Sequence, residues 1–122
     1  MDHALKAESL GADILVVQGA EGGGHTGKVP TNELLPQVIE EVNIPVVAAG
    51  GFKDGLGLRR AISFGAVGIA MGTRFMMTSD SPVPRKTLER YLEAKSSDIV
   101  VTEKFDGLPH RLINNKLIMK VN

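Results

Sequence analysis

Short apolar runs alternate with amphipathic stretches along the chain, and this pattern predicts strands followed by helices. Runs dominated by apolar residues cover 14–17, 44–49 and 66–71. Such short runs are typical of strands that are buried on both faces, as in a parallel sheet. Helices are predicted from Ala4 to Gly11 and from Thr31 through Val42.

Two more helices and a less regular tail follow. One helix is predicted from Asp54, as its N-terminal cap, to Gly65, and another after Pro84 through Leu88 and Leu92. Beyond residue 95, a strand over 99–102 and a turn over 107–109 are expected. The order is therefore one helix, three strand–helix units and an arm, which predicts an α/β fold with parallel strands.

Three parallel strands leave two open sheet edges, so the chain is too short to close on itself. A closed (β/α)8 barrel needs eight strands and about 250 residues. The chain has 122 residues. The sequence therefore predicts a partial TIM (β/α)8 barrel, which is either a fragment or one part of something assembled from two chains.

Composition narrows the classes of function. The chain has 14 Lys and Arg against 14 Asp and Glu, so it lacks the basic excess of proteins that bind nucleic acids or anionic membranes. It contains no Cys, which excludes disulfides and thiolate zinc sites. No apolar run approaches the roughly 20 residues that span a bilayer. We expect a soluble, cytoplasmic protein without nucleic-acid or membrane partners.

Glycine-rich loops follow all three predicted strands, at the end where parallel α/β proteins bind ligands. The first, 18–25, has three successive Gly that allow close approach of the backbone to a ligand, and it ends in His25, which can exchange protons near neutral pH. Gly50–Gly51 and Gly72–Thr73 follow the other two strands and suggest a phosphate site. The alternatives are a solvated His25 and glycines that only terminate strands.

Other polar residues carry weaker signals. Glu21 is a candidate general base or an exposed loop carboxylate. Arg74 is a candidate phosphate ligand or a surface ion-pair partner. His3 and His110 lack metal-ligand spacing to His25, so no metal site is predicted.

Several segments together match a known pattern. They are Gly11–Asp13 leading to Gln18–Gly27, then 34–38, 44–51 with Asp54–Gly55, 65–75, and 101–102 with 107–111. In register, these segments resemble the nitronate monooxygenase family, formerly called 2-nitropropane dioxygenases, which includes FMN-dependent enoyl-ACP reductases and related acyl-CoA enzymes. The resemblance covers nearly the whole chain.

This resemblance implies an FMN-dependent TIM-barrel oxidoreductase, of which the chain is roughly the C-terminal half. Residues 1–96 would form (β/α) units of the barrel and residues 97–122 an arm that packs on it. His25 matches the family's catalytic histidine. The positions that match FMN contacts are Gln18, Gly23, Gly24, Gly50, Gly51, Ala70, Met71, Gly72 and Thr73.

The function expected from the resemblance is oxidation of alkyl nitronates with O2. The alternatives are reduction of enoyl-ACP or acyl-CoA thioesters with NAD(P)H, and a non-catalytic half-barrel that binds a phosphorylated ligand. The expected partners are a small-molecule substrate, a nitronate or an enoyl thioester, together with a second copy of the chain or a missing N-terminal half-barrel.

Overall fold

The computed structural model of the protein describes residues 2–115. Its internal contacts divide these residues into two compact units, one of residues 2–22 and 27–71 and the other of residues 23–26 and 72–115. The boundary predicted between residues 96 and 97 stays a prediction. Within the described residues, no helix combines the length and the apolar character needed to cross a bilayer.

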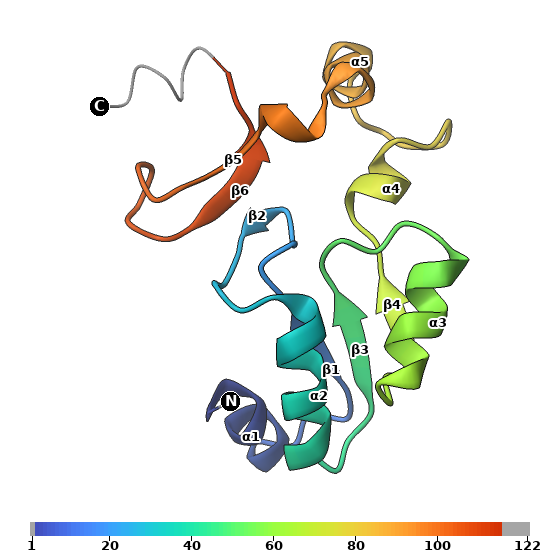
Figure 1. Cartoon of the computed structure of the whole chain (residues 1–122), viewed down its shortest axis with the longest axis vertical. Coiled ribbons are helices and arrows are strands. Elements are labelled where there is room, and N and C mark those ends of the chain that lie inside the picture. The colour runs from blue at the N-terminus through green and yellow to red at the C-terminus, as the bar shows by residue number, and fades with distance from the viewer. Residues whose placement is uncertain (1, 116–122) are drawn as a thin grey trace. The chain divides into compact units, whose positions relative to one another are not determined.

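The first unit is one parallel sheet with helices packed against it. Its strands are β1 (Leu15–Gln18), β3 (Val46–Ala49) and β4 (Gly68–Ala70), and its helices are α1 (Asp2–Ser9), α2 (Thr31–Glu41) and α3 (Gly55–Ser63). The strands are parallel and lie in the order β1-β3-β4, with α2 against β1 and β3 and α3 against β4 (Figure 1). The predicted parallel α/β class is confirmed.

The core of this unit lies between one face of the sheet and the helices. Val17 and Ala48 point from the sheet into a buried cluster that also contains Leu35 and Val38 of α2 and Ala61 of α3. Burying this apolar surface is the main force that holds the helices on the sheet.

The prediction that 14–17 is buried on both faces is wrong. Val17 is 8% exposed, whereas its neighbour Val16 is 63% exposed. Successive side chains of a strand point to opposite faces, and only the Val17 face of β1 packs on the helical cluster.

Local signals explain where the helices begin and end. The carboxylate of Asp54 accepts a hydrogen bond from the N–H of Gly57 at 2.9 Å, so it caps α3 as predicted. After α1, Gly11 has a φ of 92°, a left-handed conformation that glycine adopts without a steric penalty.

The second unit contains an antiparallel sheet and short helices. Its strands β2 (Gly24–His25), β6 (His110–Ile113) and β5 (Ile99–Thr102) lie in that order, and its helices are α4 (Thr73–Met76), α5 (Arg85–Glu93) and the 3-10 helix η1 (Ser96–Asp98). The strand predicted over 99–102 is confirmed, and the predicted turn at 107–109 lies between β5 and β6. Neither β2 nor β6 was predicted.

Candidate functional site

The carboxyl ends of the three parallel strands meet at one edge of the first unit. The register pairs Gln18 of β1 with Ala49 of β3, and Ala49 with Ala70 of β4. Gly50 and Gly51 follow β3 directly. The structure therefore brings together the five predicted cofactor-binding positions of this unit, which are Gln18, Gly50, Gly51, Ala70 and Met71.

Glycine is required at several positions of this edge by close packing. Gly50 and Gly51 have φ values of 101° and 79°. A Cβ atom on Gly50 would lie 3.0 Å from the Thr31 hydroxyl, and one on Gly22 would lie 2.3 Å from the side-chain amide of Gln18. The missing side chains leave room for the Gln18 amide to lie over Gly22 and for the chain after β3 to turn tightly.

Thr31 and Glu21 form a polar contact at the start of α2. The backbone N–H and the hydroxyl of Thr31 both donate to Oε2 of Glu21, at 2.9 and 2.5 Å. Thr31 is 7% exposed, and a Cβ on Gly19 would lie 2.2 Å from its hydroxyl oxygen. Glu21 is an exposed loop carboxylate, as one of its two predicted alternatives has it, and this carboxylate also holds the first turn of α2 beside the end of β1.

A groove of about 460 Å³ opens beside this contact. Glu21, Thr31, Gly51, Arg60 and Phe64 are among the residues that line it. The volume falls within the roughly 300–1,000 Å³ of small-molecule sites, and the lining combines a carboxylate, a guanidinium and an aromatic ring. The groove can therefore admit a polar ligand of moderate size.

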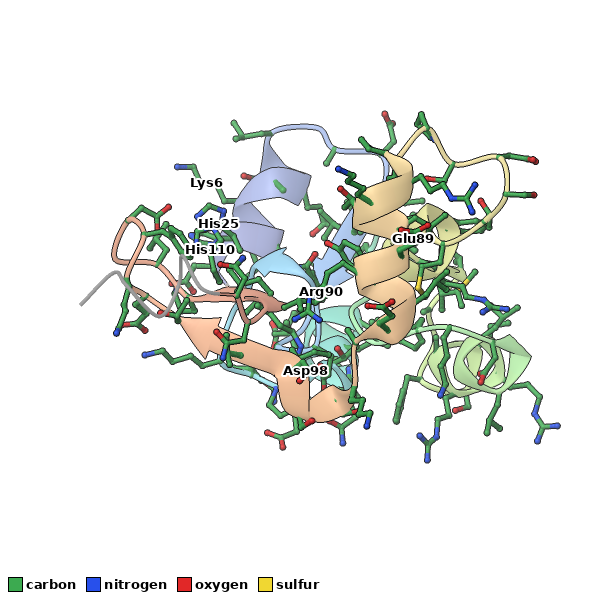
Figure 2. The ribbon with its side chains drawn as sticks, turned by 90° about the horizontal axis from the view of Figure 1, so that it is seen from above. Lys6, His25, Glu89, Arg90, Asp98 and His110 are labelled. Carbon is green, nitrogen blue, oxygen red and sulfur yellow. The ribbon has the colours of Figure 1, made fainter. Side chains whose placement is uncertain are left out.

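A histidine cluster is the main polar feature of the second unit. The pairing of β2 with β6 sets His25 directly opposite His110, and their ring centroids lie 3.6 Å apart at 47° (Figure 2). Nε2 of His25 and Oδ2 of Asp106 are hydrogen-bonded at 2.8 Å, and Nδ1 of His110 lies 3.6 Å from Oδ1 of the same carboxylate. The predicted catalytic residue thus has two titratable neighbours.

The carboxylate of Asp106 is held in its ionised form. The hydrogen bond from His25 is the largest cause that lowers the pKa of Asp106 below 3.8, and a hydrogen bond from the N–H of Leu108 lowers this pKa further. An acceptor that is ionised throughout the neutral range therefore faces both imidazole rings.

The same three side chains could hold a metal ion. One ligand atom from each of His25, Asp106 and His110 lies within 4.8 Å of the others. The sequence prediction found no metal-ligand spacing, because His25 and His110 are far apart in the chain and meet only through the pairing of β2 with β6. A strand of only two residues shows no alternation of apolar and polar positions, so the sequence could not reveal the pairing of β2 with β6.

The remaining predicted cofactor positions belong to the second unit. Gly23, Gly24, Gly72 and Thr73 lie in its two chain segments, and α4 begins at Thr73. A Cβ on Gly23, Gly24 or Gly72 would meet no atom within 4 Å, so close packing does not require glycine there. The roles of these four residues stay predictions.

The chain matches one described protein family and is similar to several known proteins. The family described as nitronate monooxygenase matches residues 1–122. A (3aS,4S,5R,7aS)-5-hydroxy-7a-methyl-1-oxo-octahydro-1H-indene-4-carboxyl-CoA dehydrogenase of Rhodococcus jostii (strain RHA1) is 54% identical over 116 residues, which are 95% of this chain and 33% of the relative. A probable nitronate monooxygenase of Staphylococcus aureus (strain JH9) is 39% identical and covers 100% of this chain, which spans 37% of that relative.

A solved structure confirms the fold class. FabK from Thermotoga maritima superposes with a TM-score of 0.90 at 39% identity, over 98% of this chain and 38% of FabK. The architecture is that of part of a (β/α)8 barrel, as predicted. The chain spans about a third of the length of the curated relatives it matches.

Proposed function

Because the chain belongs to the nitronate monooxygenase family, we propose that it forms part of an FMN-dependent oxidoreductase. The observation that carries the proposal is the alignment of three parallel strand ends, where Gln18, Gly50–Gly51 and Ala70–Met71 lie at one edge. Phosphorylated ligands bind at this edge in α/β proteins. When bound, FMN would supply the redox chemistry.

The residues at this edge fit such a ligand. Gln18, Gly51 and Ala70 are exposed, so their polar backbone groups and the Gln18 amide are within reach of a ligand. A Cβ on Gly51 would lie 3.0 Å from Cβ of Glu21, so the chain passes close to its neighbour here and only glycine leaves it uncovered. We assign the phosphate side of FMN to this edge.

We assign the proton transfer of the reaction to His25. Its imidazole can give or take a proton near neutral pH. The hydrogen bond with Asp106 at 2.8 Å orients the ring and balances the positive charge that the ring acquires when it takes a proton. The carboxylate is suited to this because it stays ionised.

The proposed substrate is a CoA thioester. The support is the identity of 54% with a relative named as a carboxyl-CoA dehydrogenase, against 39% with a probable nitronate monooxygenase. Oxidation of an alkyl nitronate with O2 is the second candidate, and it rests on the latter relative. A non-catalytic barrel part that binds a phosphorylated ligand is the third.

The test uses the full natural protein that carries this chain. We expect visible flavin absorbance after purification, and turnover of an acyl-CoA exceeding turnover of an alkyl nitronate under O2. His25→Ala should keep its flavin and lose about 10²- to 10⁴-fold in turnover, the usual contribution of a general acid or base. His3→Ala, which replaces an exposed histidine of α1, is the matched control.

Each outcome separates the candidates. A colourless protein that cannot be reconstituted with FMN contradicts the cofactor assignment and favours the non-catalytic candidate. Faster turnover of the nitronate reverses the choice of substrate. Wild-type turnover by His25→Ala removes His25 from the mechanism and leaves the cofactor assignment standing.

A further inference from the structure

We infer that His25, Asp106 and His110 form a binding site for one divalent transition-metal ion, with zinc as the best-suited metal. The three side chains come from two strands and the turn between β5 and β6. Two imidazoles and one carboxylate are a donor set that binds zinc with a fourth position open to water. The site shares His25 with the proposed function, so an ion bound at Nε2 would block the proton transfer assigned to that residue.

The distances from the two imidazoles to the Asp106 carboxylate lie on either side of the separation expected in a tetrahedral site. Metal–ligand bonds of about 2.0–2.1 Å place tetrahedral ligand atoms about 3.3–3.4 Å from one another. Here Nε2 of His25 lies 2.8 Å from Oδ2 of Asp106, and Nδ1 of His110 lies 3.6 Å from Oδ1. Shifts well under 1 Å in these two separations would accommodate the ion, which would replace the proton shared by His25 and Asp106.

At His110, the metal would displace only weak contacts. Its Nδ1 has Leu108 O at 3.4 Å and Asp106 Oδ1 at 3.6 Å, both beyond ordinary hydrogen-bond length. With the proton on Nε2, this nitrogen is free of its own hydrogen and presents a lone pair toward the carboxylate. The ionised carboxylate then supplies the negative charge that favours a cation.

The backbone fixes the ligands before a metal arrives. His25 and His110 are register partners, and four further residue pairs join β5 to β6 on either side of the turn that carries Asp106. The N–H of Leu108 donates to Oδ1 of Asp106 at 3.0 Å and holds the carboxylate in place. Such outer hydrogen bonds orient metal ligands in known sites.

Solvent can reach the site. The side chains of His25 and Asp106 are 57% and 43% exposed, so an ion can enter and keep water as its fourth ligand. Since nitrogen and mixed nitrogen–oxygen sites favour zinc and its neighbours in the first transition series, we expect no measurable affinity for Mg²⁺ or Ca²⁺.

The experiment is a calorimetric titration of the full natural protein with Zn²⁺, repeated with Mg²⁺. We expect one Zn²⁺ per chain. His110→Ala and Asp106→Asn should each weaken binding by at least the roughly 10- to 100-fold that loss of an outer hydrogen-bond partner costs. His3→Ala should bind as the wild type does, and the flavin content of all variants should be unchanged.

A second measurement needs no variant. Zn²⁺ should protect His25 and His110 of the wild-type protein, but not His3, from carbethoxylation followed by mass spectrometry. The inference is overturned if Zn²⁺ does not bind saturably, if both variants bind it with wild-type affinity, or if His3 is protected equally. Loss of flavin without loss of Zn²⁺ binding would contradict the proposed function and leave the metal site intact.

Discussion

The hydroxyl of Thr31 offers a sharp test of how the first unit holds its binding edge. Thr31→Val keeps the shape of the side chain and removes only the hydroxyl, which donates to the Glu21 carboxylate at 2.5 Å within a site that is 7% exposed. A hydrogen bond to a charged group contributes about 1.5–3 kcal/mol. We expect Thr31→Val to lower the free energy of unfolding by that amount.

Thr31→Ser is the matched control because it keeps the hydroxyl and loses one methyl group. That loss costs about 0.8 kcal/mol by area alone. The free energies of unfolding come from urea titrations of the full natural protein, followed by far-ultraviolet circular dichroism. Thr31→Ser should therefore remain more stable than Thr31→Val.

A double-mutant cycle with Glu21→Gln isolates the pair. Residues in direct contact show coupling energies of about 0.5–3 kcal/mol, so the two substitutions together should cost less than the sum of their separate effects. The reasoning is refuted if Thr31→Val is as stable as Thr31→Ser, or if the two substitutions are additive.

Two further predictions concern Gly19 and Asp106. In Gly19→Ala the new Cβ would lie 2.2–2.4 Å from side-chain and backbone atoms of Thr31, so the free energy of unfolding should fall by about 1–3 kcal/mol or more. The control is Gly55→Ala, whose Cβ would have no atom within 4 Å. This variant should not lose stability in the same urea titration. A carboxyl ¹³C NMR titration should give Asp106 a pKa below 3.8, and this pKa should rise toward 3.8 in His25→Ala because the largest lowering cause is gone. Because the pKa of Asp106 is depressed in the folded protein, the stability that its ionised carboxylate contributes is present above pH 3.8 and is lost as the pH falls through the folded-state pKa. An unchanged Asp106 titration in His25→Ala would contradict the assignment of His25 as the largest cause of the lowered pKa.

Much of the first unit could be predicted from the sequence because its signals are local. Apolar runs, the Asp54 cap and the glycine after α1 each act over a few residues, and they located every strand and helix of this unit to within a few positions. The exposure of Val16 could not be predicted in this way. An apolar run does not say which of its two faces will meet a helix.

The histidine cluster shows where such reasoning stops. Gly24 and His25 have no preference for a strand, and only their pairing with Arg111 and His110 makes them one. The contact between His25 and Asp106 depends on that pairing and on the turn between β5 and β6. The imidazole and the carboxylate that form this contact are 81 positions apart in the chain, so no short motif records it.

The placement of β2 also determines where the chain can be divided. The main-chain boundary between the units falls after Met71, yet residues 23–26 belong with residues 72–115. A peptide that stopped at Met71 would carry Gly24 and His25 without the strand that binds them, and one that began at Gly72 would leave β6 with an unpaired edge open to association with other strands. Residues 23–26 stand in the chain between two segments of the first unit but belong to the second, so a single cut after Met71 would leave both products incomplete.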